Sequence, residues 1–180
     1  SGFILVFFLS WMYPLFALII KLQSRGPIIY KQLREGKDGI HFLCFKFRTM
    51  HLNGESDYSW TKVNDPRVTR FGVFLRRTSL DEFPQFWNVL KGDMSIVGPR
   101  PERKFFIEKI AARAPHYKHL LKVRPGITSL GQVKYGYAEN VDQMVKRLEF
   151  DIVYIENMSL AMDFRIIMYT ILVVVQGRGK

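Results

Sequence analysis

Cysteine is almost absent from this sequence, since Cys44 is the single one. One cysteine can form neither an intrachain disulfide nor a zinc site built from several thiolates. Proteins stabilised by their own disulfides are therefore excluded, and a reducing compartment is the better expectation.

Several common nucleotide and metal motifs are missing as well. The sequence contains no Gly-x-x-x-x-Gly-Lys-Ser/Thr, no Gly-x-Gly-x-x-Gly and no His-Glu-x-x-His. The P-loop, dinucleotide-binding and zinc-protease classes thus lack their characteristic residues. The four histidines do not form a convincing metal set, and His116 and His119 are more typical of surface residues.

Acidic residues are outnumbered, 16 against 27 Lys and Arg, which gives a formal net charge of +11. At the same time 48% of the 180 residues are hydrophobic. This length and composition predict one domain with a sizeable core and exclude disorder. So basic a surface suits nucleic acid, an anionic membrane face or a substrate that carries phosphate.

Charged side chains are absent before Lys21, and residues 3–20 form an almost uninterrupted apolar run. As a helix this run reaches about 27 Å, close to the roughly 30 Å of a bilayer core. Pro14 lies inside the run and predicts a kink or break, so we expect a bent, re-entrant membrane helix over residues 1–22. The alternative is a helix buried in the protein core. A secretory signal peptide fits poorly, because no basic segment precedes the run and no small-residue cleavage site follows it.

Basic residues follow the apolar run directly, at Lys21, Arg25, Lys31, Arg34 and Lys37. By the positive-inside tendency they place this side toward the cytoplasm. Each cation near an anionic leaflet gains about 1 kcal/mol, so a membrane already accounts for the basic balance. Nucleic-acid binding is therefore not expected. Ser1 is not a natural first residue, which leaves upstream sequence open.

Residues 27–34 and 40–50 have the pattern of two strands joined by the turn-rich segment 35–39, which predicts a β-hairpin. Alternation along the second strand separates an apolar face (Leu43, Phe45, Phe47) from a face with two cations (Cys44, Lys46, Arg48). Two such cations, about 7 Å apart, could clamp a phosphate. A solvated strand face is the alternative.

Asp81 and Glu82 stand at the start of a stretch with helical spacing, which Gly92 ends. Ser79-Leu80-Asp81-Glu82 matches a capping box, in which acids stabilise a helix start by local electrostatics. On this pattern alone, the acidic pair is more typical of a helix cap than of a catalytic site.

The remaining segments alternate between loops and helices. Residues 51–66 predict a polar loop, and helices are expected over about 102–113, 141–156 and 160–175. Asn140 resembles the cap of the second of these. A loop at 124–128 leads to a short strand expected near Gln132 and Val133. The last helix is largely apolar and could lie in a membrane interface or on the core.

Taken in order along nearly the whole chain, these segments resemble the monotopic phosphoglycosyl transferases. Those bacterial sugar transferases load a phosphosugar onto a polyprenyl phosphate carrier. The resemblance rests on the apolar run with Pro14 and on the segments 46–50 (KFRTM), 65–72 (DPRVTRFG), 76–85 (RRTSLDEFPQ), 91–101 (KGDMSIVGPRP) and 125–128 (PGIT), followed by Gln132, Val133 and Asp163.

The resemblance implies an α+β enzyme. A re-entrant membrane helix (1–22) would precede a small, mostly helical catalytic domain (23–180) with a short β-hairpin and interfacial amphipathic helices. A nucleoside diphosphate sugar, usually a UDP-sugar, would be the donor and undecaprenyl phosphate the acceptor. Asp81 would attack the sugar-proximal phosphate and release UMP, and the acceptor would then attack the covalent intermediate.

The resemblance also assigns countercharge to this site. The repulsion between the Asp81 carboxylate and one unit of negative charge on a substrate is about 4 kcal/mol at 4 Å and an effective dielectric constant of about 20. Mg²⁺ on Glu82, together with Lys46, Arg76 and Arg100, would offset it. Supporting positions implied by the resemblance are Asp163, Pro125, Gly126 and Gln132.

The expected location is the bacterial inner (cytoplasmic) membrane, with the catalytic domain on the cytoplasmic face and membrane lipid as a partner. There the enzyme would start a surface glycan; a homodimer is left open. The alternative from another class is a non-catalytic, membrane-anchored basic module that binds anionic lipid or nucleic acid.

Two positions depart from the family pattern. Tyr13 precedes Pro14, where small members often have Ser, which puts the hydrogen bonding at the expected break in doubt. Ser129 follows Thr128 where Gly is more common, a change that bears on the nucleotide or sugar pocket.

Overall fold

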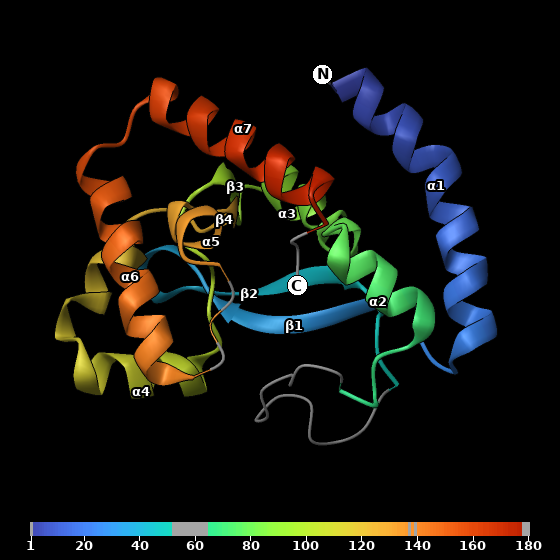
Figure 1. The fold of residues 1–180 in the computed structure, drawn as a ribbon, viewed down its shortest axis with the longest axis horizontal. Helices are drawn as coiled ribbons and strands as arrows, with labels where there is room; N and C mark the ends of the chain where they lie inside the picture. The colour runs from blue at the N-terminus through green and yellow to red at the C-terminus, as the bar shows by residue number, and fades with distance from the viewer. Residues whose placement is uncertain (1, 52–64, 137, 139, 178–180) are drawn as a thin grey trace.

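Helices surround two small sheets in the computed structural model, which describes residues 2–51, 65–136, 138 and 140–177 (Figure 1). The predicted α+β class is confirmed. Most of the loop predicted for residues 51–66 lies outside the described residues. In chain order the elements are α1 Gly2–Gln23, β1 Ile29–Glu35, η1 Lys37–Gly39, β2 His41–Phe47, α2 Arg70–Arg77, η2 Leu80–Glu82, α3 Gln85–Lys91, β3 Ser95–Val97, α4 Lys104–Arg113, η3 Pro115–Lys122, β4 Gly126–Thr128, α5 Leu130–Lys134, α6 Val141–Glu156 and α7 Leu160–Val175.

The predicted hairpin is present: β1 and β2 pair antiparallel from Ile29–Phe47 to Glu35–His41. Its faces differ from the prediction. Leu43 is exposed, whereas Cys44 is buried and packs with Met94 in a small apolar cluster. Alternation places side chains on opposite faces but does not say which face another element covers.

The second sheet was not expected from the sequence. β3 and β4 pair in parallel, which joins Ser95 to Gly126 and Val97 to Thr128. The strand predicted near Gln132 is wrong, because this segment is the short helix α5. Ser129 begins that helix, and its hydroxyl accepts a hydrogen bond from the Gln132 backbone N–H at 3.0 Å.

Of the kink or break predicted at Pro14, a break is wrong, because helix α1 continues through this residue. Its inner side packs on the hairpin and α2, with Phe16 in edge-to-face contact with Phe47 and Phe71 at ring distances of 5.6 and 5.3 Å. Ile20 and Leu75 complete this cluster. Among the residues that the structure describes, no helix has both the length and the apolar character needed to cross a membrane. The re-entrant course stays a prediction.

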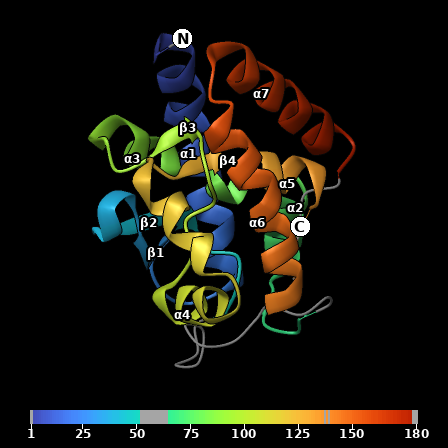
Figure 2. The same cartoon turned by 90° about the vertical axis from the view of Figure 1, so that its left-hand side faces the viewer.

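The C-terminal half forms its own core beside the hairpin. α4, η3 and α6 enclose Phe106, Ile110, Tyr117 and Leu148, and α7 lies against α5, β3 and β4 (Figures 1 and 2). The predicted cap of α6 is confirmed, since Asn140 Oδ1 accepts a hydrogen bond from the Gln143 N–H at 2.9 Å. This half holds the loop between β3 and α4 in place.

Candidate active site

Asp81 and Glu82 lie in η2, the short turn between α2 and α3. The capping-box interpretation is wrong, because Ser79 makes no side-chain cap hydrogen bond. Ser79 instead adopts a left-handed conformation with φ 55°, which is unfavourable for a residue other than glycine. The chain therefore turns sharply at Ser79 and presents both acids between the two helices.

The Glu82 carboxylate joins two cations from distant segments. Its Oε1 accepts hydrogen bonds from Lys46 Nζ of β2 at 2.5 Å and from Arg100 Nη2 of the loop after β3 at 3.1 Å. Burial alone would raise the pKa of Glu82, but Lys46 and Arg100 hold it well below its usual range. The structure thus brings three of the predicted site residues together, with Glu82 fixed as an anion.

Asp81 stands in the opposite electrostatic situation. Burial raises the pKa of its carboxyl above the usual value, Lys46 lowers it, Glu82 raises it, and Arg76 and Arg100 lower it. Among the described parts of the chain, no hydrogen bond or ion pair engages the Asp81 carboxylate. Two neighbouring acids in different environments are suited to different tasks. Of the two carboxylates, Asp81 has lone pairs that no described partner engages, which is what a nucleophilic carboxylate requires.

Arg76 reaches the site from the last turn of α2. Its Nε donates to the hydroxyl of the buried Thr49, at 2.9 Å. The guanidinium is close enough to Asp81 to lower the pKa of that acid. Arg76 therefore joins Lys46 and Arg100 as the third predicted cation at this site.

The loop that carries Arg100 rests on the 125–128 segment. Gly98 N–H donates to Thr128 O at 3.0 Å, and Gly126 N–H donates to Pro99 O at 2.9 Å. A Cβ on Gly126 would stand 2.1 Å from the Gly98 nitrogen, so the two glycine backbones touch directly. Pro125 contributes its carbonyl, which accepts from Ser95 N–H at 2.8 Å. The predicted supporting positions Pro125 and Gly126 thus hold the Arg100 loop.

Arg48 does not lie in the phosphate-binding set to which the strand pattern assigned it. Its side chain is only 3% exposed. The guanidinium donates to Ser24 Oγ at 3.1 Å and to the carbonyl oxygens of Ser24, Pro27 and Ile20. Arg48 therefore closes the C-terminal end of α1, where the last carbonyls have no partner within the helix.

Within the described residues, no hydrogen bond or ion pair joins Asp163 or Gln132 to the acidic pair. Asp163, in the first turn of α7, accepts a hydrogen bond from Tyr154 Oη at 2.8 Å, and it is not among the main charges that shift the pKa of Asp81. The Gln132 side chain belongs to α5, and its Oε1 is buried with no hydrogen-bond partner in the part of the chain that the structure describes.

Two buried polar groups near the site have no counterpart in the sequence-based prediction. Asn88 of α3 accepts from Phe45 N–H at 3.1 Å and donates to Leu43 O at 2.8 Å, which ties α3 to β2. Glu102, just after Arg100, is held by Arg34 of β1 and by Arg147 of α6. Burial would raise the pKa of Glu102, but Arg147 and Arg34 lower it. Glu102 directly follows the segment 91–101, which carries part of the family resemblance. This position was the one signal in the sequence that could have pointed to Glu102.

The acidic pair offers carboxylate oxygens, which are ligands that Mg²⁺ prefers. No group of three or more His, Cys, Asp and Glu could hold a metal within the described ranges. Mg²⁺, however, is often held by one or two carboxylates together with substrate phosphates. Glu82 fits that mode, if phosphate oxygens of a substrate complete the donor set.

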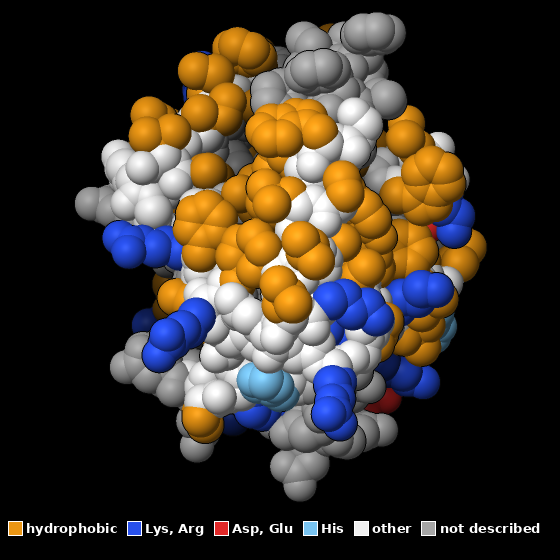
Figure 3. All heavy atoms as spheres, turned by 90° about the vertical axis from the view of Figure 1, so that its right-hand side faces the viewer, with side chains coloured by type: hydrophobic (Ala, Val, Ile, Leu, Met, Phe, Trp, Pro, Cys, Tyr) orange, Lys and Arg blue, Asp and Glu red, His pale blue; other side chains and the backbone are white. Residues whose placement is uncertain are grey.

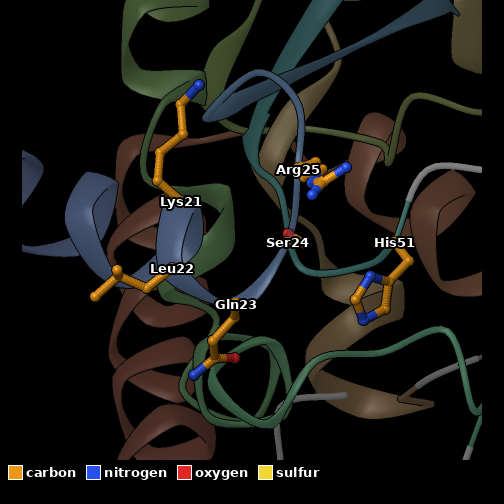
Figure 4. A pocket seen from close by; sticks show the side chains of 6 residues that line it. All are labelled: Lys21, Leu22, Gln23, Ser24, Arg25 and His51. Carbon is orange, nitrogen blue, oxygen red and sulfur yellow. The ribbon is translucent and has the colours of Figure 1, made fainter.

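A pocket of about 550 Å³ lies elsewhere, at the end of α1 (Figure 4). It is lined by Lys21, Leu22, Gln23, Ser24, Arg25 and His51. Lys21 points away from Arg25 and His51 in this view, so the cations do not converge on one point. The chemistry is better assigned to the acidic pair than to this pocket.

The model of the family described as "Bacterial sugar transferase" matches residues 1–177, so the chain belongs to that family. It is 43% identical over 164 residues to the UDP-N-acetylgalactosamine-undecaprenyl-phosphate N-acetylgalactosaminephosphotransferase of Aeromonas hydrophila, covering 91% of this chain and 39% of that protein. It is 46% identical over 159 residues to the UDP-glucose:undecaprenyl-phosphate glucose-1-phosphate transferase of Escherichia coli (86% and 34% covered). With a protein of the same name from Caulobacter vibrioides it shares 44% identity over 158 residues (86% and 59% covered).

The chain therefore spans between about a third and three fifths of the length of these relatives. The names of these three relatives share a UDP-sugar, undecaprenyl phosphate and a sugar-phosphate transfer.

Proposed function

We propose that the protein transfers a sugar-1-phosphate from a UDP-sugar to undecaprenyl phosphate and releases UMP. One observation carries this proposal: Glu82 is committed to Lys46 and Arg100, while the adjacent Asp81 carboxylate faces the same cations without an ion pair of its own among the described residues. Such a site suits a carboxylate nucleophile that reacts with an anionic phosphate.

In the first step an Asp81 carboxylate oxygen attacks the phosphorus next to the sugar. The bond from this phosphorus to the bridging diphosphate oxygen breaks, and the electron pair leaves with UMP. A phosphosugar then remains on Asp81 as an acyl phosphate. Lys46, Arg76 and Arg100 face the charge that develops on the phosphoryl and leaving oxygens.

In the second step a phosphate oxygen of undecaprenyl phosphate attacks the same phosphorus. The bond to the Asp81 oxygen breaks, which regenerates the carboxylate and yields undecaprenyl diphosphate sugar. Two transfers of this kind let a soluble donor and a lipid acceptor use one site in turn.

We also propose Mg²⁺ as the cofactor, held by Glu82 with the donor diphosphate. When bound it would neutralise phosphate charge. Lys46 and Arg100 orient the Glu82 carboxylate toward this task through their hydrogen bonds to Oε1.

A location at the cytoplasmic face of the bacterial inner membrane is part of the same proposal. Figure 3 shows hydrophobic side chains gathered over the face formed by α1 and α2, bordered by Lys and Arg. Trp11 of α1 and Phe74 of α2 are 54% and 48% exposed. An apolar patch with a basic border suits the surface of an anionic bilayer. Cysteines placed at positions 1 and 180 test the re-entrant course, because labelling of the two ends from opposite membrane faces would contradict it.

Activity is tested by UMP release from a panel of UDP-sugars with undecaprenyl phosphate and Mg²⁺ in detergent micelles. Wild-type protein should release UMP with at least one donor, and Asp81→Asn should lose at least about 10³-fold in rate. The control Asp142→Asn, an exposed acid of α6, should behave as wild type. With donor alone, intact mass should show a phosphosugar adduct on Asp81.

Three outcomes would contradict the proposal. Absence of UMP release with every donor would contradict an enzymatic function. It would favour a basic module that binds anionic lipid or nucleic acid without turnover. Equal release by Asp81→Asn, or an adduct on another residue, would remove Asp81 as the nucleophile.

A further inference from the structure

Thr49 contacts both ends of helix α2 from a position 20 to 27 residues away in the chain. At the start of the helix its carbonyl oxygen accepts from the N–H of Thr69 at 3.0 Å, and Thr69 is the N-cap residue of α2. In the last turn its hydroxyl accepts from Arg76 Nε at 2.9 Å. Thr49 itself is buried, with 6% of its surface exposed, and its bond to Arg76 is partly buried.

The close approach of Thr49 to the helix depends on Gly72. A Cβ at position 72 would stand 2.1 Å from the Thr49 carbonyl oxygen, well inside contact distance. The backbone at Thr49 is held from the other side as well, because the preceding Arg48 binds the end of α1. The Thr49 hydroxyl therefore occupies a fixed place relative to α2.

Arg76 needs such a fixed partner. An arginine side chain has several rotatable bonds, and a charge that stabilises a transition state must be held in place before the reaction. A hydrogen bond at Nε fixes the plane of the guanidinium, since the donors form a rigid fork.

We propose that Thr49 is a positioning residue of the transfer site, whose hydroxyl holds the Arg76 guanidinium beside Asp81. This inference rests on the proposed function, in which Asp81 attacks a phosphate. Thr49 touches neither substrate nor reacting atoms and acts through Arg76 alone.

The test separates the hydroxyl from the packing of the side chain. Thr49→Val keeps the shape and removes the acceptor, whereas Thr49→Ser keeps the acceptor and removes a methyl group. Positioning predicts a loss of about 10-fold in kcat for Thr49→Val, with a smaller change in KM for the donor, and retention of most activity in Thr49→Ser. A packing role predicts the reverse order, and that order would overturn the inference.

A second pair keeps the test valid if Thr49→Val does not fold. Thr49→Ser and Thr49→Ala leave nearly the same space but differ in the hydroxyl, so equal kcat values for the two would overturn positioning. Ser159→Ala is the control, because it removes a hydroxyl that accepts only from the Met162 N–H at the start of α7 among the contacts described; it should keep wild-type kcat.

Coupling to Arg76 provides an independent readout. In an Arg76→Lys background, Thr49→Val should cost less than about 2-fold further, since the Nε donor is gone. An undiminished 10-fold loss in that background would contradict an action through Arg76. Wild-type protein that is inactive with every donor would instead contradict the proposed function, which distinguishes the two failures.

Discussion

The ammonium of Lys46 lies 2.5 Å from Glu82 Oε1, although 36 residues separate them in the chain. Lys46 comes from the end of the hairpin and Glu82 from the turn between α2 and α3. The pair fixes one acid as a bound anion and leaves the adjacent Asp81 beside a positive charge. This asymmetry between two neighbouring carboxylates is the basis of the predictions that follow.

Replacement of Lys46 by Met should lower kcat for UMP release by about 10²-fold, because the variant loses a cation that faces the phosphoryl charge. Glu82 would keep Arg100 as its partner, so the protein should still fold. Lys109→Met removes a lysine that lies over the Phe105 ring in α4 and should retain the wild-type rate. Activity of Lys46→Met within a few-fold of wild type would argue against a role of Lys46 in the transfer.

The rate should fall on acidification at a higher pH than an ordinary aspartate would cause. Burial raises the folded-state pKa of Asp81, so this carboxyl takes up a proton already above the usual value of about 3.9. The protonated acid cannot attack phosphorus, and kcat is therefore lost as the pH falls through this raised pKa. A pH–rate profile of the first turnover, read by adduct formation, measures the midpoint. In Lys46→Met the midpoint should move further up, and a wild-type midpoint at or below 4 would contradict the assignment.

Gly126→Ala should lower the free energy of unfolding by at least about 2 kcal/mol, because its Cβ would overlap backbone atoms that have no room to move. UMP release should fall with it, since the Arg100 loop rests on this backbone. Gly36→Ala is the comparison: its Cβ would lie 3.1 Å from the nearest atoms and its φ of −109° suits alanine. Chemical denaturation of both variants gives the measurement. Equal stability of the two would show that the Gly98–Gly126 contact is not tight.

Asp151→Asn should stabilise the protein at neutral pH. Burial raises the pKa of Asp151 to about 6, although the Gly131 N–H and Arg147 lower it. The folded state then binds the proton more tightly than the unfolded chain. The stability from this group is complete below about pH 4 and is lost as the pH rises to about 6.

The Asn variant does not titrate, so it does not lose stability as the pH rises. Its side-chain oxygen can still accept the hydrogen bond from the Gly131 N–H, which is 2.8 Å long in the wild type. Its advantage over wild type should grow between pH 4 and 6 to at most about 3 kcal/mol. Unfolding by urea across this pH range provides the comparison. A difference that is constant with pH would mean that Asp151 titrates normally.

Local signals in the sequence were sufficient for the hairpin and for the Asn140 cap, because neighbouring residues determine both. The Arg48 assignment failed for the opposite reason. Alternation places Arg48 beside Lys46 on the strand, but nothing local reveals that the open end of α1 lies against it. The buried Arg34–Glu102–Arg147 group escaped prediction in the same way, since its members come from three distant elements.

The strand expected at Gln132 failed although a signal was present. Ser129-Leu130-Gly131-Gln132 has the Ser-x-x-Gln pattern of a helix start, and the Ser129 hydroxyl makes that contact. At Ser79 the same kind of pattern misled, because its backbone is left-handed and its hydroxyl caps nothing. The difference lies in the backbone conformation at the first residue, which a four-residue pattern does not specify.

Lys46 and Arg48 lie on either side of Phe47, one joined to Glu82 and the other to the end of α1. A single stretch of extended backbone, about 7 Å long, therefore sets the distance between the acidic pair and α1. One residue inserted there would turn either the ammonium or the guanidinium to the wrong side of the strand. Because the length of this stretch is fixed, the acidic pair stays at a constant distance from the end of the N-terminal helix.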